Sequence, residues 1–235
     1  MKFQEEKKEQ FDDGEMIVVT GYKRSGTSLM MSLLKNLGVE LNYCHKFEKV
    51  LQDYTAKSKF GGKNNFYFED PEICNFKAKE GKEIWYKGGV KMFAHVVTNN
   101  ISHVPDDLQQ NVKIIWMHRE AAKIETSIRR YKKPGVEYLV PGAPYSTYLE
   151  DDLDVISVLD ELHHEAIRKH PNVLTIEFDD LFKDPAGVVK DVAKFLDKSC
   201  DNHMVDKFVN LLDLSDKVPS STPIGSSSEA SQEKA

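Results

Sequence analysis

The sequence predicts an α/β fold, a three-layer α/β/α sandwich in which helices cover both faces of a mostly parallel central sheet. Two observations predict it. Short apolar runs rich in β-branched residues stand at 16–20, 112–118 and 173–178, and such runs are typical of buried parallel strands. Longer amphipathic stretches alternate with them, as in strands joined by crossover helices. A further strand is expected near residues 84–93.

The helical stretches come in the order that this fold needs. Residues 27–38 follow the first strand and end at Gly38, a natural helix stop. The leucines of this stretch share one face at helical spacing: Leu29, Leu33, Leu34 and Leu37. Asp184 and Pro185 are typical of the start of another helix. The remaining helices are expected at 120–131, 147–170, 185–197 and 202–212.

The composition indicates one domain between charged ends. With 235 residues, of which 40% are hydrophobic and 30% charged, the chain can build one full α/β core. We expect a charged lead-in at 1–14 and the α/β domain at 15–214. Residues 215–235 are rich in Ser, Pro and charge, so they cannot bury enough apolar surface to offset their ordering entropy. We therefore expect a disordered tail there.

The net charge and the absence of recognisable targeting segments in this sequence argue against several classes of protein. A net charge of −6 argues against a dedicated nucleic-acid binder. The charged N-terminus lacks the apolar core of a signal peptide, and no apolar run approaches the ~20 residues of a membrane span. These observations predict a cytoplasmic protein without a membrane span. The sequence is compatible with a homodimer.

No metal site is predicted. The three cysteines are widely spaced and form no Cys-x-x-Cys pair, so they suggest neither a disulfide framework nor a zinc site. His163 and His164 lie in the long helical stretch beside Glu161 and Glu165, without further ligands at metal-site spacing. We interpret these histidines as part of a solvated helix face.

The most informative stretch is GYKRSGTS, residues 21–28, between the first strand and the first helix. A loop in this place presents backbone N–H groups to an anion, and the helix dipole adds positive potential. It has the two glycines and the final hydroxyl of a Walker A loop, but Thr27 replaces the lysine that meets the β- and γ-phosphates. The candidate phosphate-binding residues are Lys23, Arg24, Ser25, Gly26, Thr27 and Ser28.

A second motif follows the strand at 112–118. Arg119 stands at the carboxyl end of this strand, and Ser127 lies two turns along the next helix. An arginine offers planar, charge-assisted donors to a phosphate, and a serine adds a hydroxyl from one side. Ligands of parallel α/β sheets bind beyond the carboxyl ends of the strands, where both motifs fall.

These motifs resemble those of the sulfotransferases. KRSGTS (23–28) is similar to the 5′-phosphosulfate loop of the family, P-[KR]-S-G-T-[TS], with Lys23 in place of the proline. It looks most like the arginine-bearing bacterial and Golgi-type members. The family carries an arginine and a serine at the spacing of Arg119 and Ser127, where the pair holds the 3′-phosphate of the nucleotide. Residues 176–197 resemble a third stretch of the family, which we interpret as scaffold.

The resemblance implies a P-loop nucleoside triphosphate hydrolase-like fold and a reaction. The enzyme would move a sulfuryl group from 3′-phosphoadenosine 5′-phosphosulfate (PAPS) to a hydroxyl, or an amine, of a small-molecule or glycan acceptor, without a metal ion. Arg24, with Lys23 or Lys91, would stabilise the charge that develops on the leaving group. Segments 40–80 and 131–148 are expected to form the acceptor pocket.

The sequence departs from the family pattern around the adenine. Leu29 stands where cytosolic members carry a stacking tryptophan, and Phe178 replaces a tyrosine. The C-terminal Arg-Lys-Gly segment that completes the 3′-phosphate site in those members has no counterpart. The resemblance therefore leaves open how the adenine is stacked.

The general base also departs from the pattern. In VKMFAHVV (90–97), Phe93 takes the place of the histidine that serves as base in cytosolic members. His95 lies two residues on, which on a strand would keep the same face. Other members of the superfamily use a glutamate after the first helix, and this sequence offers Glu69 and Asp70 there. The candidate bases are therefore Glu69, Asp70 and His95.

Two other functions remain open at the level of sequence. One is a P-loop kinase or nucleotidase with a degenerate Walker A loop. Thr27 in place of the lysine argues against it, as does the lack of a magnesium-binding aspartate after the strand at 112–118. The other is a catalytically inactive family member that binds a nucleotide or a partner.

Overall fold

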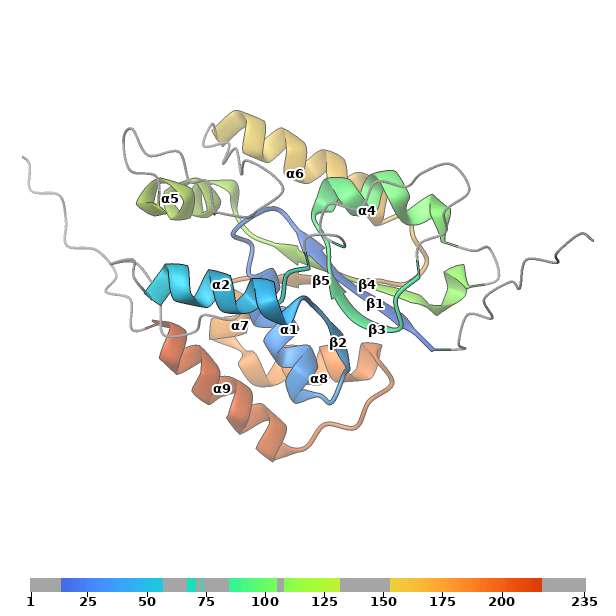
Figure 1. The fold of residues 1–235 in the computed structure, drawn as a ribbon, viewed down its shortest axis with the longest axis vertical. Coiled ribbons are helices and arrows are strands. Elements are labelled where there is room, and N and C mark those ends of the chain that lie inside the picture. Colours follow the sequence, from blue (N-terminus) through green and yellow to red (C-terminus); the bar gives the residue numbers. More distant parts are fainter. Residues whose placement is uncertain are drawn as a thin grey trace, which may run out of the picture.

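A five-stranded sheet forms the centre of the protein in a computed structural model (Figure 1). The structure describes residues 14–56, 67–70, 73, 85–104, 108–131 and 153–216. The strands are β1 (Met16–Gly21), β2 (Leu41–Asn42), β3 (Gly88–Lys91), β4 (Val112–His118) and β5 (Val173–Glu177). They lie in the order β2-β3-β1-β4-β5, and every pairing is parallel.

Helices cover both faces of this sheet, which confirms the predicted three-layer α/β/α fold (Figure 1). One face carries α1 (Thr27–Asn36), α7 (Asp180–Lys183), α8 (Pro185–Phe195) and α9 (Asn202–Asp216). The other face carries α4 (Ala94–Asn100), α5 (Ala121–Tyr131) and α6 (Leu153–Ile167). The short 3-10 helices Ile101–His103 and Gln109–Asn111 precede β4.

Alternate residues of β1 supply the two hydrophobic cores. Ile17 and Val19 pack with α1, α8 and α9, whereas Met16 and Val18 pack with α4 and the end of α6. All four side chains are buried. A parallel strand covered on both faces loses little by being apolar throughout, which is why β1 and β4 appear in the sequence as continuous hydrophobic runs.

The helix predicted at 185–197 is α8, and it begins at Pro185 as expected. The Asp184 carboxylate accepts a hydrogen bond from the N–H of Gly187 at 2.9 Å, and Pro185 occupies the first turn. A capping carboxylate satisfies one of the N–H groups that have no partner within the helix. The leucines expected on one face of α1 also agree with the structure, since Leu33, Leu34 and Leu37 are buried and Leu29 is half-buried against the core.

The strand expected near 84–93 is shorter than predicted. β3 ends at Lys91, and the chain turns at Phe93 into α4, whose Val96 and Val97 pack in the second core. A short apolar run does not by itself distinguish a strand from a buried helix. His95 therefore lies on a helix, and the prediction that it shares a strand face with Phe93 is wrong.

Two elements, β2 and α2 (His45–Ala56), were not predicted from the sequence, and α6 ends at Ile167, before the predicted residue 170. The interpretation of His163 and His164 as a solvated face is wrong, because both imidazoles are half-buried. His163 Nδ1 lies 3.2 Å from Thr98 Oγ1 on α4, and the His164 ring stacks on Trp116 with centroids 5.2 Å apart. The helix α6 packs against α4 and β4, so its inner histidines face the core.

Several predictions fall on parts that the structure does not describe. The segments concerned are 1–13, 57–66, 71–72, 74–84, 132–152 and 217–235. They include most of the expected lead-in, large parts of both expected acceptor segments, the start of the helix expected at 147–170 and most of the expected tail. Within the described ranges, no helix is both long and apolar enough to cross a membrane.

Candidate functional site

The loop of residues 22–26 leaves the carboxyl end of β1, in the middle of the sheet, and enters α1. Gly26 has φ 98° and precedes the first residue of the helix. The N–H groups of the first turn of a helix lack intrahelical acceptors and carry partial positive charge, so they favour an anion. Ser25 is fully buried, and among the described residues its hydroxyl has no hydrogen-bond partner. This free buried hydroxyl and the helix start fit a phosphate group.

Gly26 is needed for a steric reason as well as for its backbone angle. A Cβ at this position would lie 2.5 Å from Cδ2 of Phe178. We expect Gly26→Ala to lower the free energy of unfolding by roughly 2–3 kcal/mol, because a strained φ adds to the clash with an aromatic ring. Gly38→Ala is the matched control, since Gly38 has φ 73° but open space around its Cβ. Urea unfolding of both variants measures the difference, and equal losses would show that Phe178 yields without cost.

The structure brings Arg24, Arg119 and Ser127 together at this loop. Arg24 Nε donates to Ser127 Oγ at 3.1 Å, and Arg119 Nη1 donates to the backbone carbonyl of Arg24 at 2.8 Å. The Arg119 guanidinium also lies 4.0 Å from the ring centroid of Phe178, which follows β5. Three strand ends thus converge on the loop, because parallel strands place their carboxyl ends at one edge.

Lys91, at the end of β3, donates three hydrogen bonds within the site. Its ammonium donates to Glu69 Oε1 at 2.8 Å, to the Tyr67 carbonyl at 2.9 Å and to Ser28 Oγ at 3.0 Å. The Lys91 side chain is only 7% exposed, so this ion pair is shielded from water. A shielded ion pair is held more tightly than a surface one. Lys91 therefore joins the first turn of α1 to the segment that carries Glu69.

Lys23 lies close to the same group. Its ammonium stands 5.5 Å from the centroid of the Phe93 ring and is half-buried. Burial lowers the pKa of Lys23, and the charge of Glu69 opposes that change. The two predicted cations of the loop therefore have different neighbours: Lys23 lies on the side of Glu69, and Arg24 lies on the side of Ser127.

The three candidate bases differ in their surroundings. Glu69 belongs to the group of residues that bind the Lys91 ammonium, namely Ser28, Tyr67 and Glu69, which we call the Lys91 cluster. Asp70 Oδ1 instead accepts a hydrogen bond from the N–H of Ile73 at 3.4 Å. His95 is exposed in the first turn of α4 and stacks on Phe93 with centroids 5.9 Å apart. Partial desolvation of the imidazole beside its neighbours, followed by the charge of Lys23, lowers the pKa of His95. Of the three, Glu69 has the contacts that link it to the loop.

A second polar cluster lies beside Arg119, between β4 and α6. His118 Nδ1 lies 2.7 Å from Glu177 Oε2, and its Nε2 lies 3.4 Å from Asp160 Oδ2. Asp160 is 7% exposed, and its Oδ1 has no hydrogen-bond partner among the described residues. Burial raises the pKa of Asp160 to about 6; the charge of His118 opposes this change and that of Glu177 adds to it.

This raised pKa predicts a pH-dependent stability. A carboxyl with a higher pKa in the folded state stabilises the fold while protonated, and that contribution is lost as the pH rises through the folded pKa of about 6. We expect Asp160→Asn to gain roughly 1–2 kcal/mol relative to the wild type between pH 5 and pH 8. Urea unfolding at both pH values measures it, with Asp206→Asn on the exposed face of α9 as the control. A constant difference between Asp160→Asn and the wild type would contradict the assignment.

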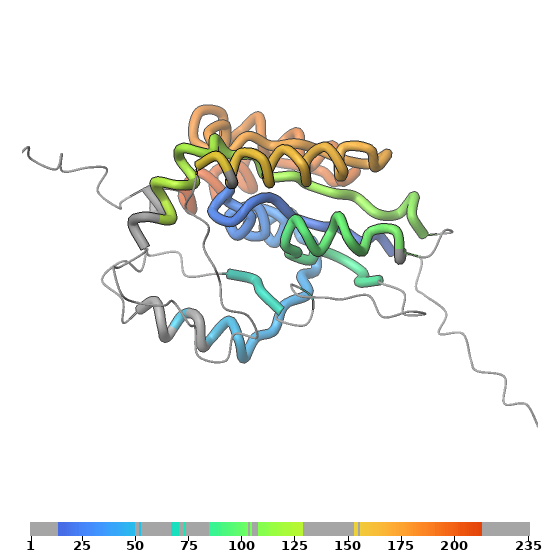
Figure 2. Tube along the Cα trace, turned by 90° about the horizontal axis from the view of Figure 1, so that it is seen from above, coloured from blue at the N-terminus to red at the C-terminus, as the bar shows by residue number. Residues whose placement is uncertain are grey.

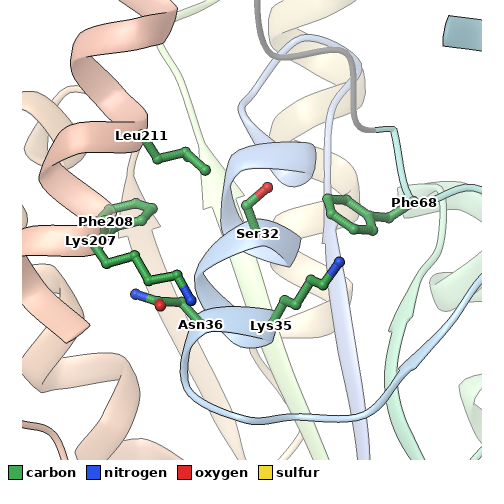
Figure 3. Close-up of a pocket in the computed structure, with 7 residues that line it drawn as sticks. All are labelled: Ser32, Lys35, Asn36, Phe68, Lys207, Phe208 and Leu211. Atoms are coloured by element: carbon green, nitrogen blue, oxygen red, sulfur yellow. The ribbon is translucent and has the colours of Figure 1, made fainter. Parts of the chain in front are cut away.

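A small pocket of about 200 Å³ lies next to the site, between α1 and α9 (Figure 3). Its lining residues are Ser32, Lys35, Asn36, Phe68, Lys207, Phe208 and Leu211. Figure 3 shows the Phe68 ring and Lys35 on one side of Ser32 and the α9 side chains on the other. Ser32 lies one helical turn beyond Ser28, so the pocket adjoins the Lys91 cluster but does not include the loop.

Comparison with known proteins identifies the family of the chain. The sulfotransferase domain family matches residues 14–233, which is nearly the whole chain. The chain belongs to the sulfotransferase family. The resemblance to this family is thereby confirmed, and the kinase alternative is not favoured. No curated protein matches the sequence.

Solved sulfotransferases share the fold at low sequence identity. A sulfotransferase from Mycobacterium avium has 13% identity and a TM-score of 0.53, over 88% of this chain and 69% of that one. Retinol dehydratase in complex with androsterone and the inactive cofactor PAP has 15% identity and a TM-score of 0.46, over 84% of this chain. A mouse sulfotransferase in complex with PAP has 16% identity and a TM-score of 0.45, over 85%. The chain spans 64% of the length of the last two proteins.

Proposed function

We propose that this protein transfers a sulfuryl group from PAPS to a hydroxyl, or less often an amine, of a small-molecule or glycan acceptor. The observation that carries the proposal is the meeting of Arg24, Arg119 and Ser127 beside the start of α1. Two anion-binding elements at one edge of the sheet suit a nucleotide with phosphates at both its 5′ and 3′ ends. The solved relatives that contain PAP, the nucleotide product of such a reaction, agree with this proposal.

The nucleotide would lie across the loop. The N–H groups at the start of α1, with the hydroxyl of Ser25 and the guanidinium of Arg24, would hold the 5′-phosphosulfate. Arg119 and Ser127 would hold the 3′-phosphate. Phe178 lies against both Gly26 and Arg119, so its ring is placed to contact the adenine that Leu29 cannot stack.

The transfer itself needs a base and a stabiliser of the leaving group. In an in-line displacement, the acceptor oxygen forms a bond to sulfur while the bond between sulfur and the bridging phosphate oxygen breaks. The Glu69 carboxylate would take the proton of the acceptor hydroxyl. Lys91 and Lys23, on the side of the loop that faces Glu69, would stabilise the negative charge on the bridging oxygen.

The extent of the domain and the place of the acceptor complete this proposal. We propose one sulfotransferase-like domain over residues 15–214, with the acceptor bound among segments 40–80 and 131–148. The cytoplasmic location and the homodimer stay predictions. Within the described ranges, no cluster of histidine, cysteine or acidic residues has an arrangement that could hold a metal ion.

Calorimetric titration tests the proposal directly. We expect PAP to bind, ATP with magnesium to bind more weakly, and Arg24→Ala to weaken PAP binding. Arg168→Ala is the matched control, because Arg168 is an exposed arginine that pairs with Glu165 just beyond α6. A preference for ATP, or PAP binding that ignores Arg24, would overturn the proposal. PAP binding without sulfuryl transfer to any acceptor in a broad panel would instead indicate an inactive family member.

A further inference from the structure

We propose that Glu48 is a positioning residue, which holds the backbone that presents Glu69 to the reaction. This inference rests on the proposed function, in which Glu69 is the base. Glu48 lies in the first turn of α2 and is 4% exposed, which is unusual for a carboxylate. A buried carboxylate is costly unless hydrogen bonds satisfy it, so its partners indicate what it does.

Both oxygens of Glu48 bind the segment that leads to Glu69. Oε1 accepts from the N–H of Tyr67 at 2.7 Å, and Oε2 accepts from the N–H of Phe68 at 2.8 Å. Figure 2 shows α2 and the segment 67–70 side by side at one margin of the molecule. Two consecutive N–H groups bound by one carboxylate fix the direction of the chain at the residue before Glu69.

The segment needs such a clamp because its backbone is strained. Phe68 has φ 52°, a left-handed angle that a residue with a Cβ rarely adopts. Angles of this kind persist only where the surroundings impose them, and they gather at functional sites. The Phe68 ring is 2% exposed and meets the Tyr43 ring edge-on at 5.4 Å. Packing of the ring and the bonds from Glu48 together hold this angle.

The clamp connects directly to the proposed reaction centre. The Tyr67 carbonyl accepts from Lys91, and the Glu69 carboxylate accepts from the same ammonium. On the other side, the backbone carbonyl of Glu69 accepts from the N–H of Cys44, one turn before Glu48. The amino end of α2 thus holds the backbone of residues 67–69 by three hydrogen bonds, two accepted by the Glu48 carboxylate and one donated by the N–H of Cys44, and the Glu69 side chain contacts Lys91.

The structural half of the proposal is tested by amide hydrogen exchange. Glu48→Gln keeps the size of the side chain but turns one acceptor into a donor, so one of the two N–H groups loses its partner. We expect exchange in a peptide covering residues 67–69 to rise about tenfold or more. Asp184→Ala is the matched control, because it removes a carboxylate–backbone bond at α8, far from α2 in the chain. Unchanged exchange at 67–69 in Glu48→Gln would overturn the inference.

The functional half is tested by PAPS turnover with 4-nitrophenol as the first of a panel of acceptors. We expect Glu48→Gln to lower kcat by about tenfold and to leave the Kd for PAP within about twofold, since the phosphate contacts lie on other elements. In a Glu69→Gln background, Glu48→Gln should have no further effect on kcat, because Glu48 acts through Glu69.

The outcomes separate this inference from the proposed function. Equal effects of Glu48→Gln with and without Glu69, or a parallel loss of PAP binding, would overturn the inference alone. A wild type that turns over no PAPS, or a Glu69→Gln variant with full kcat, would overturn the assignment of the base, and the role of Glu48 with it.

Discussion

Replacing Glu69 by glutamine is expected to lower kcat on the order of 10²- to 10⁴-fold, the range for removal of a general base. The substitution keeps the shape of the side chain and a hydrogen-bond acceptor for Lys91, but it cannot take the acceptor proton. PAP should bind the variant almost as well as the wild type, because the phosphate-binding residues that we propose are Arg24, Arg119 and Ser127, which meet beside the loop. Steady-state kinetics with labelled PAPS, together with calorimetry, measure the two quantities.

The same assay discriminates among the candidate bases. His95→Ala and Asp70→Asn are the parallel variants, and Glu165→Gln, on an exposed position of α6, is the control for loss of a carboxylate. If His95→Ala lost its kcat while Glu69→Gln kept full activity, the base would be His95, in the first turn of α4, and not Glu69. The lowered pKa of His95 would then keep its imidazole neutral, and able to accept a proton, to lower pH than usual.

Loss of Arg119 is expected to weaken PAP binding by roughly 10- to 100-fold, since a hydrogen-bonded pair with a charged group contributes about 1.5–3 kcal/mol. The loss should depend on the 3′-phosphate. Arg119→Ala should therefore bind adenosine 5′-phosphate as well as the wild type does, whereas Arg24→Ala should weaken both ligands. Calorimetry with the two nucleotides gives the comparison.

Ser127 provides a smaller version of the same experiment. Ser127→Ala is expected to weaken PAP binding by roughly 3- to 10-fold, the effect of one neutral hydrogen bond. Ser157→Ala is its control, because the Ser157 hydroxyl binds only a backbone carbonyl of its own helix, that of Leu153, among the contacts that the structure describes.

The Arg119 experiment has an outcome that would contradict the assignment. Equal weakening of PAP and adenosine 5′-phosphate by Arg119→Ala would mean that this arginine supports the loop rather than the 3′-phosphate.

The parts predicted correctly from the sequence are those that local spacing determines. The loop at 21–28 follows a buried strand and opens a helix, and Arg119 follows β4 directly while Ser127 lies in the helix that comes next. In both cases the residues around the motif are enough to predict the strand and the helix between which it lies. The family resemblance implied that both motifs serve one nucleotide, and in the structure Arg24 donates a hydrogen bond to Ser127.

The parts that were missed depend on contacts between distant residues. The run from Val90 to Val97 has the composition of a strand, but only the packing of Val96 and Val97 beneath the sheet shows that its second half is helical. Glu48 gives no signal in the sequence, because a single glutamate in a polar helix resembles a surface residue. Its role follows only from hydrogen bonds to residues 19 and 20 positions away.

The hydrogen bonds around Arg24 have one more consequence. The Arg24 carbonyl accepts a hydrogen bond from Arg119, and the Arg24 guanidinium donates one to Ser127. Arg24 also has a φ of 71°, so this residue has little freedom to move independently of the other two. The two halves of the nucleotide would then be thermodynamically coupled through one amino acid, and such coupling is reciprocal. Inorganic sulfate on the loop should raise the affinity for adenosine 3′-phosphate, and adenosine 3′-phosphate should raise the affinity for sulfate by the same factor. In Arg24→Ala this cooperativity between fragments should vanish, so that each fragment binds equally well with and without the other.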